Sequence, residues 1–140
     1  MKKLKRCFIA VLSLCLMMFV CVGCSSEKEQ SNSEGVEIDL DLSKMSVIMS
    51  YTEATNMNKK PTSYVGKVIK MKGVYDTSEN GMYHFCLVKD NTNCCFEPIE
   101  IIMKDGVYPE KGSEFTIVGT FNSYDEGGQD YYGILDAEIE

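Results

Sequence analysis

The sequence predicts a mainly β domain, in which five strands close into a small Greek-key barrel that is preceded by one α-helix. Three observations predict it. Five segments with apolar residues at alternate positions follow one another within about 80 residues, separated by turn residues. Glycines lie near the middle of the first, fourth and fifth segments, where the strands of a small barrel must bend. A stretch with apolar residues at helical spacing comes before them.

The first 24 residues have the layout of an export signal. Basic residues crowd the first six positions, an apolar run covers residues 7–22, and a small residue, Gly23, precedes Cys24. The run is shorter than the roughly 20 residues that a membrane-spanning helix needs, so a permanent span is the weaker interpretation. Cys21-Val22-Gly23-Cys24 resembles the bacterial lipobox, in which the last cysteine is lipidated. We therefore expect a signal peptide at 1–23 and a lipid anchor on Cys24; the alternative is ordinary cleavage that leaves a soluble secreted protein.

Residues 24–35 are expected to form a flexible linker after the lipidated cysteine, because residues 25–35 carry no apolar side chain. The formal net charge of −7 includes four basic residues in the first six positions, so the chain from Cys24 onward carries a net charge of about −11. Such a potential repels phosphate backbones, which excludes nucleic acid as a partner. The expected location is the extracytoplasmic face of the cell membrane, reached through the anchor.

The folded domain is expected at 36–140, beginning with a short edge strand and a helix. Residues 36–42 alternate apolar and acidic side chains, which is typical of a strand with one buried face. Ser43 is expected to cap a helix that runs to about Asn58 and ends before Pro61. One face of this helix carries Met45, Ile48, Met49 and Thr52. We interpret this stripe as core packing rather than as a metal site.

The five predicted barrel strands cover residues 65–75, 82–88, 94–103, 114–121 and 131–139. In the first, Ile69, Met71 and Gly73 are expected on one face. Asn80-Gly81 is a strong turn signal between the first two strands. Pro98 cannot donate a ladder hydrogen bond, which predicts a bulge or an edge position in the third.

Five short motifs lie in this order: Tyr64-Val65-Gly66-Lys67, Met71-Lys72-Gly73, Tyr83-His84-Phe85-Cys86, Cys94-Cys95 with Ile99-Glu100, and Ile117-Val118-Gly119-Thr120-Phe121. The strand order and glycine placement resemble the OB-fold, a five-stranded Greek-key barrel. The motifs together resemble a group of small uncharacterised bacterial lipoproteins with a C-terminal OB-like domain that carries a Cys-Cys pair. The likeness extends over about residues 43–140. It implies a fold and an address, and no reaction.

Three cysteines remain once the signal peptide and the lipidated residue are set aside: Cys86, Cys94 and Cys95. The only histidine, His84, lies two residues before Cys86, so both side chains are expected on one face of a strand. A hairpin turn centred near residues 90 and 91 would place Cys86 opposite Cys94 or Cys95. Soft ligands are therefore expected to converge at one end of a hairpin, with Glu100 as a further candidate ligand-binding residue.

Three interpretations of this group stay open. The first is a disulfide from Cys86 to one member of the pair, or simply buried thiols. The second is a Zn²⁺ or copper site formed by His84, Cys86, Cys94 and Cys95, which requires an irregular backbone at the adjacent cysteines. The third is thiol redox chemistry, for which Lys89 is the only nearby source of positive charge in the sequence.

No motif in the sequence indicates a hydrolase or a phosphate-binding loop. The acidic loop with Asp125, Glu126 and Asp130 lacks the ligand spacing of a calcium loop, so its charge is interpreted as solvation. We therefore expect a non-enzymatic binding module for a metal, a small ligand or an envelope protein, held at the membrane by its lipid anchor. The alternatives are a cell-envelope thiol oxidoreductase or metal chaperone that uses the same cysteines, and a scaffold that contacts an envelope protein.

Overall fold

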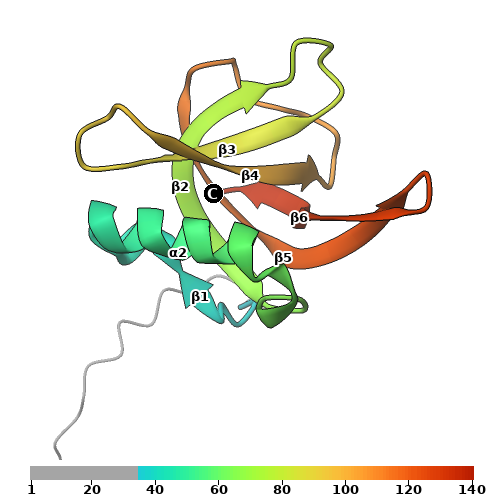
Figure 1. The fold of residues 1–140 in the computed structure, drawn as a ribbon, viewed down its shortest axis with the longest axis horizontal. Coiled ribbons are helices and arrows are strands. Elements are labelled where there is room, and N and C mark those ends of the chain that lie inside the picture. Colours follow the sequence, from blue (N-terminus) through green and yellow to red (C-terminus); the bar gives the residue numbers. More distant parts are fainter. Residues whose placement is uncertain (1–34) are drawn as a thin grey trace, which may run out of the picture. The chain divides into compact units, whose positions relative to one another are not determined.

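The computed structural model describes residues 35–140, so the predicted signal peptide, Cys24 and residues 25–34 of the predicted linker lie outside the described residues. The described part is mainly β, with a six-stranded mixed sheet and one α-helix (Figure 1). The elements are β1 (Leu40–Asp41), α2 (Val47–Lys59), β2 (Val68–Thr77), β3 (His84–Lys89), β4 (Phe96–Met103), β5 (Glu114–Glu126) and β6 (Gln129–Ile139), with 3₁₀ turns at Leu42–Lys44 and Pro61–Ser63. The prediction of a mainly β domain preceded by a helix is confirmed at this level. Between residues 35 and 140, no helix has the length and apolarity needed to cross a bilayer.

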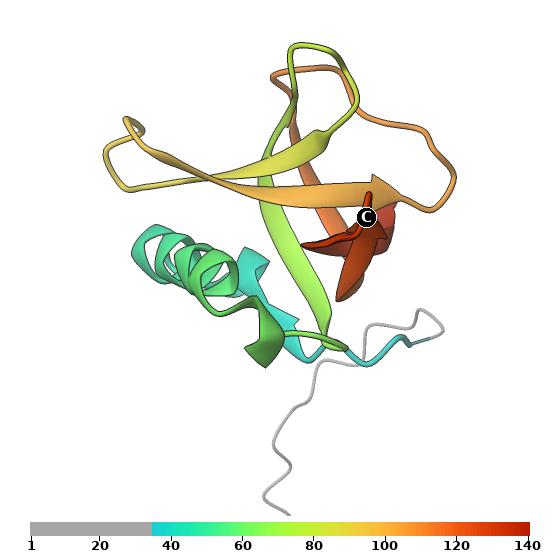
Figure 2. The ribbon, with the colours of Figure 1, turned by 45° about the vertical axis from the view of Figure 1, so that its right-hand side comes forward.

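The sheet order is β1-β2-β3-β4-β6-β5, and β2 pairs in addition with β5. Five strands therefore hydrogen bond in a closed circuit, which runs through β2, β3, β4, β6 and β5. Neighbours in this circuit are antiparallel except for β4 and β6, which are parallel. The strongly curved β2 takes part in two of these pairings and in a short parallel pairing with β1 (Figures 1 and 2).

Alternating side chains build one apolar core inside this circuit. In β2, Ile69 and Met71 are fully buried, whereas Lys72 is exposed, as the alternation of this segment predicts. The buried apolar residues are Leu42, Ala54, Met57, Tyr64, Ile69, Met71, Tyr75, Cys86, Val88, Ile99, Ile101, Met103, Phe115, Ile117, Phe121, Ile134 and Ala137.

Two of the mid-strand glycines illustrate how closely the strands approach one another. A Cβ on Gly73 of β2 would lie 2.5 Å from Cys86 Sγ, and one on Gly133 of β6 would lie 2.7 Å from the carbonyl oxygen of Glu100. Neither separation leaves room for a methyl group. The glycines predicted at strand bends are therefore sites of close approach between strands.

The helix begins later than the sequence predicts. Ser46, and not Ser43, is its N-cap, with Oγ accepting a hydrogen bond from the backbone of Met49. Ser43 lies in the preceding 3₁₀ turn, where its backbone N–H and its hydroxyl both donate to Asp41 Oδ1. Because Asp41 engages Ser43 in a turn of its own, the α-helix starts beyond it, at Val47.

The prediction that the apolar stripe of the helix packs into the core is wrong. Ile48 and Met49 are 61% and 58% exposed, and the helix instead buries Ala54 and Met57. Thr52, of the same stripe, is also exposed, and Met45 precedes the helix and packs only partly against the core. Polar contacts between the helix and the start of β4 fix this orientation, together with the small Ala54, which allows close packing. Figures 1 and 2 both show α2 alongside the β3–β4 hairpin.

The start of β4 pairs with β3 on one side, and on its other side it contacts the helix instead of another strand. Asn58 Nδ2 donates to Glu97 Oε1 at 2.7 Å and to the carbonyl oxygen of Pro98 at 2.9 Å, and Thr55 Oγ1 donates to Glu97 Oε2 at 3.2 Å. β4 pairs with β6 only from Ile101 onward. Pro98 therefore has an edge position on that side, as predicted from its missing N–H.

Other boundaries differ from the predicted ones. The predicted edge strand at 36–42 forms only two ladder pairs, at Leu40 and Asp41, and it pairs parallel to β2. β5 and β6 extend toward each other to Glu126 and Gln129, where the sequence predicts a loop from 125 to 130. Gly127 and Gly128, both with positive φ, form the tight turn that lets the ladder continue through these polar residues.

Candidate functional site

The residues predicted as ligands lie in three places. His84 and Cys86 lie on β3 and point to the inner side of the sheet, whereas Cys94 and Cys95 lie in the loop between β3 and β4. Glu100 lies on β4, opposite Phe85.

The hairpin register explains the separation. Lys89 pairs with Phe96, and Cys86 pairs with Ile99, so the expectation that Cys86 faces Cys94 or Cys95 is wrong. The loop is longer than predicted, and the backbone N–H of Asp90 donates to the carbonyl oxygen of Cys95. Cys86 lies four residues from the position opposite Cys95, about 13 Å along the strand, whereas a disulfide needs Cα atoms within about 7 Å.

Cys86 is a buried core thiol. Its side chain is 0% exposed, and burial raises the pKa of the thiol to about 12. Gly73 on β2 leaves the space that its sulfur fills. Of the predicted roles for this residue, the buried thiol is the one that fits, because a neutral, enclosed sulfur is a poor ligand and a poor nucleophile.

Cys94 and Cys95 form an exposed thiol pair organised by Asp90. The sulfurs are 3.6 Å apart, and Asp90 Oδ1 accepts hydrogen bonds from the backbone N–H groups of Thr92, Cys94 and Cys95. Asn93 has a φ of 56°, and this left-handed residue gives the irregular backbone that brings the adjacent sulfurs together. Within residues 35–140, Asp90, Cys94 and Cys95 are the one group of His, Cys, Asp or Glu side chains whose ligand atoms lie close enough to share an ion.

The surroundings of Cys95 disfavour its thiolate. The pKa of Cys95 is raised, chiefly by its hydrogen bond with Cys94 and by the charge of that neighbour, with a smaller effect of Asp90. Lys89, the predicted source of positive charge, has its Nζ 3.9 Å from Glu114. The surroundings of Cys95 therefore favour its neutral thiol over a reactive thiolate.

His84 and Glu100 instead line a hollow of about 260 Å³, which we call the tyrosine hollow. It lies between the β2–β3 loop, the β3 and β4 strands and the end of β5. Its lining residues are Met82, Tyr83, His84, Glu100, Ile101, Ile102, Tyr108, Tyr124 and Glu126.

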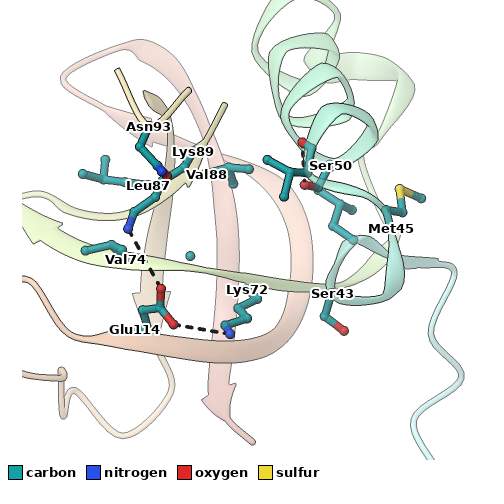
Figure 3. A pocket seen from close by; sticks show the side chains of 13 residues that line it. Ser43, Met45, Ser50, Lys72, Val74, Leu87, Val88, Lys89, Asn93 and Glu114 are labelled. Carbon is teal, nitrogen blue, oxygen red and sulfur yellow. Dashed lines mark hydrogen bonds and ion pairs between the residues drawn. The ribbon is translucent and has the colours of Figure 1, made fainter. Parts of the chain in front are cut away.

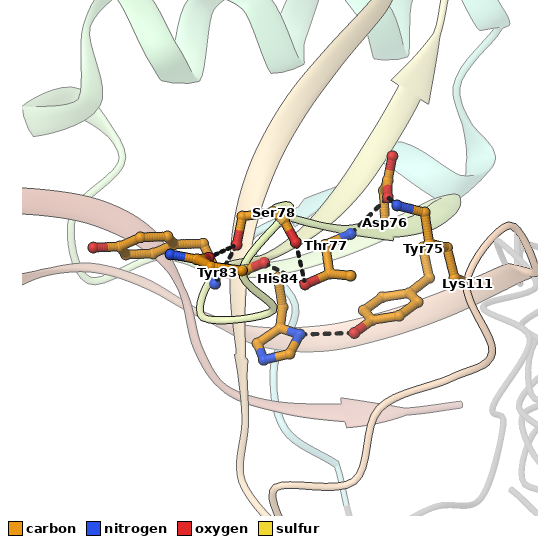
Figure 4. Close-up of polar contacts among 8 residues, drawn as sticks. Tyr75, Asp76, Thr77, Ser78, Tyr83, His84 and Lys111 are labelled. Atoms are coloured by element: carbon orange, nitrogen blue, oxygen red, sulfur yellow. Dashed lines mark hydrogen bonds and ion pairs between the residues drawn. The ribbon is translucent and has the colours of Figure 1, made fainter.

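The imidazole of His84 is fixed in the wall of this hollow. Its Nδ1 lies 2.7 Å from the hydroxyl of Tyr75 (Figure 4), and the ring stacks on Tyr108 with centroids 3.6 Å apart. Burial lowers the pKa of His84, so the neutral ring is favoured. One ring nitrogen is thus engaged with a tyrosine, and His84 shares no ion-sized group of ligand atoms with the cysteines in the described part of the chain.

Two carboxylates of the hollow are held by tyrosine hydroxyls. Tyr124 donates to Glu100 Oε1 at 2.5 Å, and Tyr83 donates to Glu126 Oε2 at 3.0 Å. The pKa of Glu100 is raised, mainly by burial, although the hydrogen bond from Tyr124 acts in the opposite direction. Glu126 was interpreted from the sequence as solvated charge, but its contact with Tyr83 makes it part of the hollow.

A second cleft, of about 320 Å³, lies where the start of α2 faces β2 and β3 (Figure 3). Its charged residues are paired with one another: Glu114 lies 3.4 Å from Lys72 Nζ and 3.9 Å from Lys89 Nζ. None of the predicted site residues within 35–140 lines it.

Comparison of the chain with family models, with curated proteins and with solved structures gives no significant match.

Proposed function

We propose that this chain is a lipid-anchored extracytoplasmic protein whose folded part is a non-enzymatic binding module, and that the tyrosine hollow is its ligand site. The observation that carries this proposal is the hollow itself. It places two of the sequence-predicted residues, His84 and Glu100, in one concave surface with aromatic walls and a few directed polar groups, which is the usual make-up of a small-ligand site.

The fold within this proposal is an OB-like barrel. Its support is the closed pairing circuit of five strands, with the third and fifth of them, β4 and β6, parallel and the other neighbours antiparallel. In this scheme, the β2–β3 loop and the β5–β6 turn flank one side of the barrel, and the hollow lies between them. OB-folds bind ligands on the corresponding side.

The anchor rests on the sequence alone. Gly23-Cys24 follows an apolar run that is too short for a membrane span, and a polar linker follows the cysteine. Two acyl chains on Cys24 would hold the domain at the membrane surface, since each buried methylene contributes about 0.8 kcal/mol.

The ligand site can be tested through His84, because the chain contains one histidine and its ring signals in an NMR spectrum are unambiguous. The full chain in detergent micelles is screened against a set of fragments that differ in charge and shape. The proposal predicts that some fragments shift the His84 ring signals and that Tyr124→Phe, which removes a hydroxyl of the hollow, weakens their binding. A matched control is Tyr51→Phe, outside the hollow. If no fragment shifts His84, or if the two variants behave alike, the hollow is not a binding site.

A second candidate function is binding of a soft metal ion at the hairpin loop, favoured by the Asp90, Cys94 and Cys95 group. Two thiolates and a carboxylate suit Zn²⁺ with water in the remaining position. Zinc titration of the full chain tests it: binding should be lost in Cys94→Ser and kept in Cys86→Ala. Equal binding by both variants would contradict this candidate.

A further inference from the structure

The carboxylates of the tyrosine hollow have no counter-charge. No lysine lines the hollow, and neither Glu100 nor Glu126 has an ion-pair partner among residues 35–140. The pKa values of Tyr83 and Tyr124 are raised and that of His84 is lowered, so these three groups are favoured in their neutral forms. All the formal charge that the hollow presents is therefore negative.

Two other carboxylates on the sheet, Asp76 and Glu114, are paired with lysines. Asp76 lies 2.6 Å from Lys111 Nζ, and Glu114 lies between Lys72 and Lys89 in the other cleft. In the hollow, by contrast, Glu100 and the exposed Glu126 line one open concave surface, and neither is paired with a lysine among residues 35–140. Glu126 is also close enough to raise the pKa of Glu100 by its charge. A cation placed between the two would relieve both this repulsion and the desolvation of Glu100.

The walls of the hollow suit an organic cation. Tyr83 and Tyr124, whose hydroxyls donate to the carboxylates, bring aromatic rings beside the acidic groups, and Tyr108 adds a third ring. An ammonium or guanidinium group is attracted to the face of such a ring, by about 0.5 to 2 kcal/mol depending on its desolvation. The volume of about 260 Å³ is slightly below the range of about 300 to 1,000 Å³ for drug-sized ligands, so the part of the ligand that enters the hollow is small.

We propose that the tyrosine hollow binds a small organic amine, with the ammonium group between Glu100 and Glu126 and the carbon chain against the tyrosine rings. This inference rests on the proposed function, because it names the ligand class of the same site. Metal ions are a poorer fit, since both carboxylates already accept tyrosine hydrogen bonds and the walls are aromatic and apolar.

A charge series of equal length tests the inference with the His84 ring signals as the readout. The probes are cadaverine, 1,5-pentanediol and glutarate, which carry positive, zero and negative charge on the same five-carbon chain. We expect saturable shifts with cadaverine, much weaker shifts with the diol and none with glutarate. Nα-acetyllysine amide extends the series to an amine carried on a peptide unit; tighter binding of this probe would point to a peptide as the source of the amine.

The variants Glu100→Gln and Glu126→Gln keep the shape of each side chain and remove its charge. Each should weaken cadaverine binding by about tenfold, the scale of a close and partly desolvated charge pair. Glu37→Gln removes one exposed charge away from the hollow and should change the affinity by less than about twofold, because solvent and salt screen it. Sharp, unshifted His84 signals in the free variants would show that the fold is intact.

The outcomes separate the two proposals. If the diol or glutarate shifts His84 as strongly as cadaverine does, or if the Gln variants bind cadaverine unchanged, the amine inference fails while the binding role of the hollow stands. If none of the probes, nor any fragment of the wider screen, shifts His84, both fail. Cadaverine binding that falls in both Gln variants and not in Glu37→Gln supports both.

Discussion

Single residues of the same type have different environments in this chain, and the cysteines show it most clearly. Cys86 is enclosed by the core beside Gly73, whereas Cys94 and Cys95 are exposed on a loop. The sequence places them within ten positions of one another, but it does not reveal the length of the loop between them. That length depends on Asp90, which accepts three backbone hydrogen bonds and so organises a loop of six residues.

The thiols should therefore differ in reactivity. In the folded full chain, iodoacetamide should alkylate Cys94 and Cys95, while Cys86 stays unmodified because its pKa is raised to about 12 and its sulfur is buried. Peptide mass spectrometry before and after unfolding in denaturant reads each position. Alkylation of Cys86 in the folded chain at the rate of Cys94 would show that β3 does not bury it.

The free energy of unfolding should fall as the pH rises and Glu100 loses its proton. Its pKa in the folded chain is raised above the ordinary value of 4.5, so the folded state binds the proton more tightly than the unfolded state does. The stability associated with the protonated form is present below that ordinary value and is lost as the pH rises through the folded-state pKa. Glu100→Gln, which stays neutral, should lose less stability over this range.

Denaturant unfolding at a series of pH values measures this difference, with Glu37→Gln as the exposed control. At neutral pH the Glu100→Gln variant should be at least as stable as the parent chain, as expected of a residue kept for binding rather than for stability. A loss of more than about 1 kcal/mol would mean that the hydrogen bond from Tyr124 outweighs the cost of burial.

At the scale of elements, the strands could be predicted and the contacts between distant strands could not. Alternation located all five long strands, because a half-buried strand needs an apolar side chain at every second position. The start of α2 could not be located in the same way, since Ser43 and Ser46 are both good caps and only the turn at Asp41 decides between them. The exposed Ile48 and Met49 show that apolar residues at helical spacing do not by themselves identify the buried face, since the helix buries Ala54 and Met57 instead.

The candidate site could be predicted only in part, because some of its residues come from strands that are distant in the sequence. His84 and Glu100 were identified from the hairpin, but Tyr108, Tyr124 and Glu126 join them only when the circuit of strands closes. The frequency of tyrosine in the second half of the chain is a signal for an aromatic surface, but it does not say which tyrosines share a face. Glu126 was the hardest to find, because an acidic residue near a glycine turn is usually solvated.

The close approach of β6 and β4 gives a prediction at this scale. Gly133→Ala would place a methyl group 2.7 Å from the carbonyl oxygen of Glu100, an atom that cannot rotate away. The free energy of unfolding should fall by about 1 to 3 kcal/mol, the usual cost of overpacking, and the His84 signals should shift as the hollow is distorted. Ser123→Ala on the exposed surface of β5 is the matched control. An unchanged free energy of unfolding would contradict the close packing.

At the scale of the whole molecule, the proposed function combines an acidic folded domain with an expected lipid anchor. A flexible linker over residues 25–35 would have a root-mean-square length of about 18 Å, enough to lift the domain off a lipid surface. The negative charge of the chain from Cys24 onward would keep the domain away from anionic headgroups and would attract small cations to the tyrosine hollow. The expected anchor and the proposed ligand site would together suit a protein that meets small ligands outside the cytoplasm.

The most direct test of this account is the intact mass of the chain extracted from the membranes of the bacterium that makes it. The account predicts a chain that begins at Cys24 and carries the added mass of a diacylglyceryl group, with Cys24→Ser left at full length and without lipid. The full-length chain of 140 residues, free of lipid and recovered from the soluble interior of the cell, would contradict it.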